Sequence, residues 1–393
     1  MQLRSARLSS AVAATLAAAL GLAGRQHASA QTPQPKPPAA SVQPSQPKPL
    51  AAPDAAPVKW SDGLRQRPEW YATDEAARVA DNLLAYQSDE GGWDKNIDMA
   101  ALLPAAKLAE LVRNRKNVHP TIDNGATYTQ LAYLARVFAA RGQERHREAF
   151  FRGFDYLLRA QYANGGWPQY FPLREGYYSH ITYNDNAMIG VMKLMRDAAK
   201  GKAPYAFVDA ERRAKAARGV ERGVECILKT QVVVAGKRTV WCAQHDEVTF
   251  APAPARKFEP VSLTGLESVE IVRFLMKYER QDARVVGAVE SAVEWFRAAQ
   301  LSGVRWVERR DPKQPGGYER AAVADPTAPP IWARFYELGT NRPIFLGRDA
   351  VVRYSVAEIE SERRNGYRWY TDEPAELLDK DYPAWKKRLA SAK

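Results

Sequence analysis

Two short stretches of the chain place a carboxylate among polar neighbours at the start of an apolar helical pattern. Residues 179–188 read SHITYNDNAM and contain Asp185, and residues 121–127 read TIDNGAT and contain Asp123. Asn and Asp compete for backbone hydrogen bonds and favour caps and turns. One interpretation is therefore that Asn184 or Asp185 caps the following helix. The other is that the carboxylates bind a hard cation such as Ca²⁺, which prefers carboxylate and carbonyl oxygens.

A glutamine followed by a tryptophan recurs along the chain and indicates how these stretches are positioned. The four pairs are Gln87 with Trp93, Gln161 with Trp167, Gln231 with Trp241, and Gln300 with Trp306. The glutamines are 74, 70 and 69 residues apart, and the third pair contains a four-residue insertion. Such a period is typical of stacked structural repeats.

Pairs of amphipathic helical patterns lie between these signatures. The pairs are 124–142 with 145–161, 184–201 with 210–231, and 268–280 with 282–300. They predict a mainly α fold, a partial (α/α) toroid of about three helix-hairpin repeats, with irregular loops and short strands on the active-site face. Asp123 and Asp185 begin successive pairs, at what the spacing predicts to be equivalent repeat positions. Their convergence at one rim favours a metal or catalytic site over capping.

The first 58 residues do not read as part of this fold. Residues 1–30 have early arginines, an apolar stretch and a small-residue cleavage pattern ending at Ala30, which predicts a signal peptide rather than a membrane anchor. Residues 31–58 are rich in Pro, Ala, Gln, Ser and Lys and predict a linker, so that residues 59–393 form the folded domain. The protein is therefore expected to be secreted or periplasmic, and a monomer.

The net charge and the aromatic content indicate which kind of molecule the protein binds. The formal net charge is +12. In an exported protein this excess favours a polyanionic polymer, although a merely basic surface is an alternative. Ten tryptophans and eighteen tyrosines suit sugar stacking as well as packing. There is no nucleic-acid-binding motif. Cys226 and Cys242 are the only cysteines, and the sequence leaves open whether they pair.

Five ordered motifs together resemble a known family. They are TIDNGATYTQL, AQYANGGWPQYFPLREGYYSHITYNDNAM, VWCAQHD, ARKFEPVSLTGLES and IWARFYELGTNRPIFLGRD. The chain from about Trp60 to its end resembles the pectate lyases of polysaccharide lyase family 10. The resemblance implies a calcium-dependent lyase that cleaves α-1,4-polygalacturonate (pectate) by β-elimination, leaving 4,5-unsaturated oligogalacturonates.

The resemblance also implies roles for individual residues. Asp123 and Asp185 match the carboxylates of the calcium and substrate site. Arg256 matches the catalytic base of the family, and Arg334 and Arg348 match arginines that bind substrate carboxylates. Arginine forks suit this task because they bind carboxylates in a bidentate way, where lysine offers a point charge.

An arginine base is chemically demanding, so other residues are also considered. The ordinary pKa of arginine lies far above neutral, which predicts an alkaline pH optimum. His180 and His245 have better intrinsic pKa values and are alternative bases or substrate-site residues. Trp167, Tyr170 and Tyr183 are candidates for substrate stacking or for packing near the site.

Two other function classes remain open at this point. A toroidal glycoside hydrolase would use a pair drawn from Asp123, Asp185 and Asp246, but it would leave the arginine motifs without a role. A non-catalytic acidic-polysaccharide binding protein would account for the charge and the aromatic residues, but not for the paired aspartates.

Overall fold

The computed structural model describes residues 58–314 and 316–391. The described residues pack into one compact unit. The predicted signal peptide and nearly all of the predicted linker lie outside the described residues. Among the described residues, no helix combines the length and the apolar character needed to cross a membrane.

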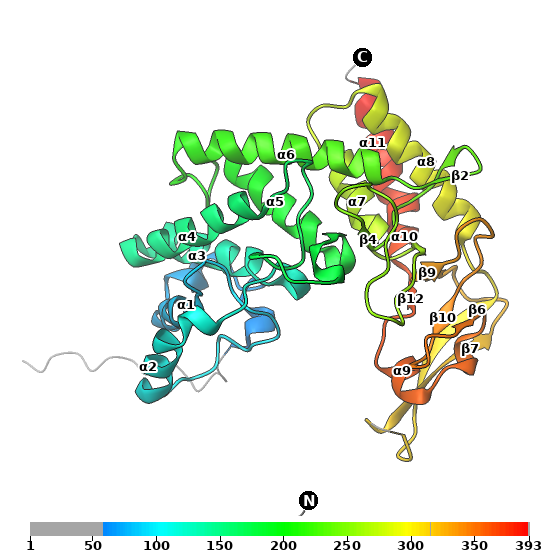
Figure 1. The fold of residues 1–393 in the computed structure, drawn as a ribbon, viewed down its shortest axis with the longest axis horizontal. Coiled ribbons are helices and arrows are strands. Elements are labelled where there is room, and N and C mark those ends of the chain that lie inside the picture. Colours follow the sequence, from blue (N-terminus) through cyan, green and yellow to red (C-terminus); the bar gives the residue numbers. More distant parts are fainter. Residues whose placement is uncertain (1–57, 315, 392–393) are drawn as a thin grey trace, which may run out of the picture. The chain divides into compact units, whose positions relative to one another are not determined.

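The fold is mainly α, as predicted (Figure 1). Its longer helices are α1 (Asp74–Tyr86), α2 (Ala105–Arg113), α3 (Tyr128–Arg141), α4 (Glu144–Ala160), α5 (Ala187–Ala199), α6 (Ala210–Thr230), α7 (Glu267–Met276), α8 (Ala283–Ala299) and α11 (Tyr382–Ser391). Shorter ones are α9 (Ser361–Asn365) and α10 (Glu373–Glu376). The three predicted hairpins are α3/α4, α5/α6 and α7/α8.

The hairpins stack as two rows of helices, the arrangement of a partial (α/α) toroid. In the inner row α5 lies between α3 and α7, and in the outer row α6 lies between α4 and α8. Helix α1 contacts α3 and α4 and extends the outer row. Each outer helix ends at one of the repeated glutamines.

The repeated glutamine joins neighbouring repeats. Its side-chain amide donates to its own loop and to the next outer helix: Gln87 to Gly91 O (2.7 Å) and Ala149 O (2.8 Å), Gln161 to Gly165 O (3.0 Å) and Gly219 O (2.8 Å), and Gln231 to Thr239 O and Ala288 O (both 2.9 Å). We call this pair of bonds the glutamine clamp.

The tryptophan of the signature anchors the loop to the preceding helix. The indoles of Trp93, Trp167 and Trp241 are fully buried and donate to the carbonyl four residues before the glutamine. In the fourth repeat the same bond is made by Trp332, to Phe296 O at 2.7 Å. The sequence match to Trp306 was therefore wrong, because Trp306 lies in a strand and is only partly buried.

In the described part of the chain each strand pairs with one other strand, always antiparallel, and all strands but β6 and β7 have two residues. The pairs are β1 (Ile181–Thr182) with β4 (Gln244–His245), β2 (Val233–Val234) with β3 (Lys237–Arg238), β5 (Leu263–Thr264) with β9 (Phe335–Tyr336), β6 (Val304–Arg310) with β7 (Tyr318–Ala324), β8 (Trp332–Ala333) with β12 (Tyr370–Thr371), and β10 (Phe345–Leu346) with β11 (Val352–Arg353).

Two apolar cores hold the elements in place. The larger one fills the space between the helices. The smaller one gathers Phe258, Phe335, Phe345 and Trp369 beneath the loops of the C-terminal third. Cys226 and Cys242 are both buried free thiols, so they do not form a disulfide.

Candidate active site

Two tight turns carry the paired aspartates into the inner helices. The turn η4 (Asp123–Gly125) leads to α3, the turn η6 (Asn184–Asn186) leads to α5, and the two turns contact each other. Ala126 N–H donates to Asp123 O (2.9 Å), and Ala187 N–H donates to Asn184 O in the same way. The carboxylates are therefore offset by one residue in the repeat, rather than strictly equivalent.

Neither aspartate caps a helix. The helices α3 and α5 have no side-chain cap, and Asp185 itself has a positive φ of 50°. A left-handed conformation is uncommon for a residue other than glycine and tends to persist at functional sites. The structure thus removes the capping interpretation.

Asp123 is buried and held by a cation and an amide. Its Oδ2 accepts from Gln169 Nε2 at 2.6 Å and forms an ion pair with Lys95. Burial opposes the charge of Lys95, but the Asp123 carboxylate raises the pKa of this lysine above its ordinary value. The other amide atom, Gln169 Oε1, is buried and has no hydrogen-bond partner among the described residues.

Asp185 is more exposed and is held by an arginine. Arg334 Nη2 donates to Asp185 Oδ1 (3.1 Å) and Asn184 Oδ1 (3.0 Å), and it also pairs with the buried Glu267. Partial burial raises the pKa of the Asp185 carboxyl, Arg334 opposes this rise, and the charges of Glu267 and Asp123 add to it. Because the turns η4 and η6 contact each other, the two carboxylates belong to one site.

Arg256 lies on the loop after β4 and pairs with a glutamate. Its Nε donates to Glu259 Oε2 at 2.8 Å, its Nη2 donates to Glu259 Oε1, and its side chain is about half exposed. The hydrogen bonds that Arg256 donates to the Glu259 carboxylate raise the pKa of the Arg256 guanidinium above its already high ordinary value. In this arrangement Arg256 is a protonated cation.

Tyr367 connects the aspartates to Arg256. Its hydroxyl donates to Glu259 Oε1 at 2.9 Å, and the Arg334 guanidinium carbon lies 4.6 Å from the centre of its ring. A continuous set of contacts therefore runs from Asp185 through Arg334, Tyr367 and Glu259 to Arg256.

Three guanidinium groups surround the ring of Phe258. The guanidinium carbons of Arg256 and Arg348 each lie 5.0 Å from the ring centre, and that of Arg363 lies 4.4 Å from it. Arg348 is exposed and pairs with Glu362 (2.7 Å). Arg363 is 4% exposed, and its Nε and Nη2 have no hydrogen-bond partner in the described part of the chain. Burial lowers the pKa of Arg363.

The aromatic candidates separate into lining and packing residues. Tyr170 lies under Arg174, with 4.7 Å between guanidinium carbon and ring centre, and 6.0 Å from Lys95 Nζ. Trp167 and Tyr183 have no exposed surface. In this structure they support the loops and offer no face to a sugar.

The two candidate histidines, His180 and His245, differ in how accessible their side chains are to solvent and substrate. His245 is fully buried, its Nδ1 bonds Phe250 O (2.9 Å), and its Nε2 accepts from Cys242 N (3.1 Å). Burial lowers the pKa of His245 to about 4, so it is a neutral structural residue here. His180 is partly exposed and lies between the turn η5 (Tyr177–Ser179) and β1.

Sequence reasoning did not single out several residues of the site. They are Lys95, Gln169, Glu259, Glu267, Arg363 and Tyr367. Each comes from a different loop or helix end and contacts the predicted residues only in the folded chain. Gln169, Glu259 and Glu267 lie inside two of the five family motifs, and this membership is the signal that could have found them.

The donor set around the aspartates fits a calcium ion. Asp123 and Asp185 offer carboxylate oxygens, and Gln169 Oε1 is a buried amide oxygen without a partner beside Asp123. Ca²⁺ binds oxygen ligands of these kinds. Lys95 and Arg334 balance the two negative charges in the present arrangement.

Comparisons of the sequence and of the structure with known proteins agree with each other. The family model described as pectic acid lyase matches residues 87–378. The family 10 polysaccharide lyase from Cellvibrio cellulosa is 33% identical, with a TM-score of 0.69, covering 79% of this chain and 93% of that one. A mutant of that enzyme in complex with trigalacturonic acid has the same identity, a TM-score of 0.68, and coverage of 79% and 94%. No curated protein matches the chain.

Proposed function

Because the chain belongs to the pectic acid lyase family and is a pectate lyase of family 10, we propose that it cleaves α-1,4-polygalacturonate by calcium-dependent β-elimination, with Arg256 as the base. The products are 4,5-unsaturated oligogalacturonates. The observation that carries this proposal is the convergence of two non-capping carboxylates beside a row of arginines.

The acidic half of the site would hold the metal and the sugar carboxylate. Asp123, Asp185 and the amide oxygen of Gln169 would bind Ca²⁺, which, when bound, stabilises the negative charge that develops on the substrate carboxylate. Arg334 was predicted to bind a substrate carboxylate, but it is buried and already pairs with Asp185 and Glu267, so we assign it to positioning Asp185, as Lys95 positions Asp123. Glu267 in turn fixes Arg334, so the geometry is set before substrate arrives.

The basic half of the site would bind the polymer and remove the proton. The exposed Arg348 offers a fork to a substrate carboxylate, in exchange for Glu362. Arg256 would accept the proton on C5, which is acidified by the adjacent carboxylate. Arg256 can accept this proton only as the neutral guanidine. Because the pair with Glu259 raises the pKa of Arg256, we expect the reaction to be slow below alkaline pH.

One assay separates the proposal from its alternatives. Polygalacturonate is incubated with the protein and the ultraviolet absorbance of the unsaturated product is followed, with Ca²⁺, with a chelator, and after Ca²⁺ is restored. We expect absorbance that the chelator abolishes and Ca²⁺ restores. Reducing ends without ultraviolet absorbance would indicate a hydrolase, and neither signal would indicate a binding protein.

Asp185→Asn tests the metal assignment in the same assay. The variant removes one carboxylate charge with almost no change of shape, so we expect half-saturation with Ca²⁺ to need at least a tenfold higher concentration. Asp74→Asn is a matched control, because the Asp74 side chain is fully exposed on α1 and, within the described part of the chain, its one ion pair is with Arg141. A lyase rate independent of Ca²⁺ in the wild type would contradict the proposal.

A further inference from the structure

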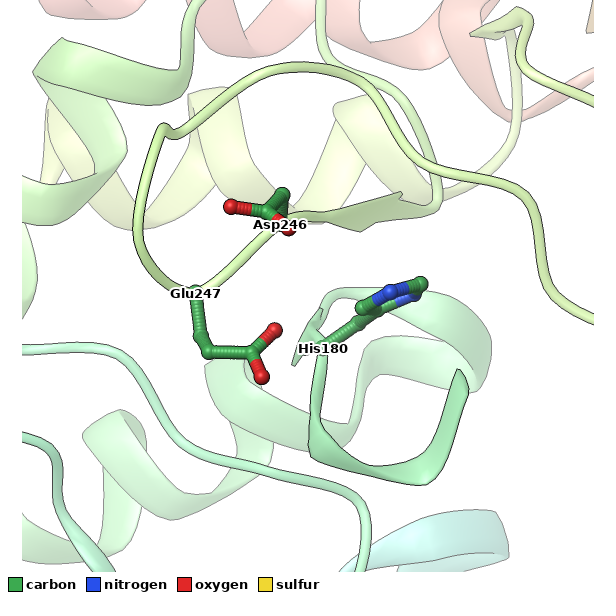
Figure 2. Close-up of side chains that lie close together, drawn as sticks. All are labelled: His180, Asp246 and Glu247. Carbon is green, nitrogen blue, oxygen red and sulfur yellow. The ribbon is translucent and has the colours of Figure 1, made fainter. Parts of the chain in front are cut away.

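Outside the site of the two aspartates, a histidine and two carboxylates come together. His180, Asp246 and Glu247 each place a potential ligand atom within 4.8 Å of the other two (Figure 2). His180 immediately precedes β1, and the two acidic residues immediately follow β4. The β1–β4 ladder pairs Ile181 with His245, so backbone pairing fixes this approach.

The surroundings of the cluster hold its backbone and one carboxylate rigidly. Asp246 Oδ1 accepts from Val248 N (3.0 Å), Thr249 N (2.7 Å) and Thr249 Oγ1 (2.9 Å). Asn164 Nδ2 donates to the main-chain oxygen of Glu247 at 2.6 Å. The segments that contain Asn164, His180 and Asp246 are therefore held together by the β1–β4 pairing and by the Asn164 bond to the main chain, not by the three proposed ligand side chains.

Two atoms of the cluster lack the partners that buried polar atoms normally have. His180 Nδ1 and Glu247 Oε2 are inaccessible to solvent and have no hydrogen-bond partner among the described residues. Buried polar groups in native proteins are usually satisfied, because leaving one unpaired is destabilising. An imidazole nitrogen and a carboxylate oxygen are both acceptors that a cation would satisfy.

We propose that His180, Asp246 and Glu247 form a second cation site, selective for a divalent transition metal such as Zn²⁺. One imidazole nitrogen with two carboxylate oxygens is a donor set that Zn²⁺ accepts, whereas Ca²⁺ is bound by oxygen ligands. Three protein ligands leave room for water to complete the coordination.

The role of this site is structural. It joins the segment that leads from His180 into the Asp185 turn to the loop that leads from β4 to Arg256. A bound ion would fix the spacing between these two segments. The inference is independent of which residue is the base in the lyase reaction.

Zinc titration of the untagged chain tests the proposal. The chain is freed of metal, saturated with Ca²⁺, and titrated with ZnCl₂ by calorimetry, with CoCl₂ used separately as a spectroscopic probe. We expect one Zn²⁺ per chain with a Kd in the micromolar range or below, visible absorption from bound Co²⁺, and a Tm that rises with Zn²⁺.

Substitution of the proposed ligands tests whether Zn²⁺ binds at this cluster. Glu247→Gln and His180→Gln should each weaken Zn²⁺ binding at least tenfold and remove the Co²⁺ absorption, while His119→Gln, at an exposed histidine, should not. Glu247→Gln preserves the side-chain shape and decides the question if His180→Gln does not fold. Absence of saturable Zn²⁺ binding, unchanged binding in Glu247→Gln, or equal loss in Asp185→Asn would overturn the proposal.

Discussion

At the scale of single residues, three cations of the site each face acidic partners. Lys95 faces Asp123, Arg334 faces Asp185 and Glu267, and Arg256 faces Glu259. The last pair has the clearest chemical consequence. Glu259 stabilises the protonated form of the residue proposed to act as a base, so this one carboxylate sets the pH at which Arg256 becomes competent.

Glu259→Gln should move the activity to lower pH. Removing the carboxylate lowers the pKa of Arg256, so a larger fraction of the guanidine is neutral at any given pH. We expect the rising limb of kcat/KM to shift downward by about 1 to 3 pH units. Pre-steady-state or steady-state rates across pH 7 to roughly 11 would measure it, provided the fold is verified at each pH.

Glu337→Gln serves as the control, because Glu337 is a partly exposed glutamate whose carboxylate accepts hydrogen bonds from Thr340 and Tyr354 rather than from Arg256. It should leave the pH profile unchanged. A Glu259→Gln profile that superimposes on the wild type would show that Arg256 does not lose a proton in the rate-determining chemistry.

Arg348→Ala should mainly weaken substrate binding. The fork on a substrate carboxylate acts in the ground state and in the transition state alike, so its loss raises KM more than it lowers kcat. We expect KM for polygalacturonate to rise about 10- to 100-fold, the range of one charged hydrogen-bonding group. Arg65→Ala removes a still more exposed arginine charge elsewhere on the surface and should have little effect. A fall in kcat at constant KM would contradict the binding role.

The sequence identified part of this site for physical reasons. Asp123 and Asp185 stand out because polar turns before apolar helices recur with the repeat. Arg363 does not, because a lone arginine in a charged stretch reads as a surface residue, and its burial against Phe258 and Tyr367 is a tertiary effect. Trp167 and Tyr183 were equally compatible with stacking and packing, and burial decides for packing.

At the scale of elements, the glutamine clamp is the repeated bond of the fold. The side chain of Gln87 bridges its own loop and helix α4, and Arg152 on that helix donates back to Gln87 Oε1 at 2.7 Å. The clamp sets the spacing of neighbouring outer helices and of the loops that precede the inner ones. The geometry of the site therefore depends on bonds made away from its charged groups.

Gln87→Ala should destabilise the chain. Two carbonyl oxygens and Arg152 lose their partner in a buried place, which we expect to lower the free energy of unfolding by roughly 1–3 kcal/mol. Gln300 is the matched control from the same repeat series, since it is exposed and makes no side-chain hydrogen bond with the described residues. Denaturant unfolding of both variants measures the difference, and equal stability would rule out a structural role for the clamp.

The helical hairpins were predictable and the fourth repeat was not. Apolar periodicity and the glutamine spacing locate α3 to α8 because those helices bury one face against their neighbours. Between Gln300 and its tryptophan partner the chain inserts the hairpin β6/β7, so the partner is Trp332 rather than Trp306. A fixed spacing cannot detect an insertion of that length.

At the scale of the whole molecule, the excess of positive charge fits a polyanionic substrate. The formal charge is +12, and the loss of three arginines with the proposed signal peptide would leave +9. The arginines around Phe258 concentrate part of that charge at the site. Long-range attraction of this kind accelerates the encounter with a charged polymer and is screened by salt.

Raising the ionic strength should lower kcat/KM for the polymer more than for the trimer. The screening length falls from about 10 Å at 0.1 M to about 3 Å at 1 M, so the attraction of distant uronate groups disappears first. We expect KM for polygalacturonate to rise with NaCl at fixed saturating Ca²⁺ while kcat stays nearly constant. A salt effect of the same size on trigalacturonate would show that only local contacts matter.

The third glutamine loop shows what the clamp tolerates. In the second repeat Gln161 donates to Gly165 O, and in the third repeat Gln231 makes the equivalent bond to Thr239 O. The third loop has four more residues between the glutamine and the carbonyl that accepts from it. The extra chain leaves as the hairpin β2/β3, with the left-handed residues Ala235 and Gly236 at its tip and Val233 largely exposed. Loop length is thus decoupled from helix spacing. We therefore expect that a peptide inserted at the tip of this hairpin would leave the helices that carry the aspartates in place.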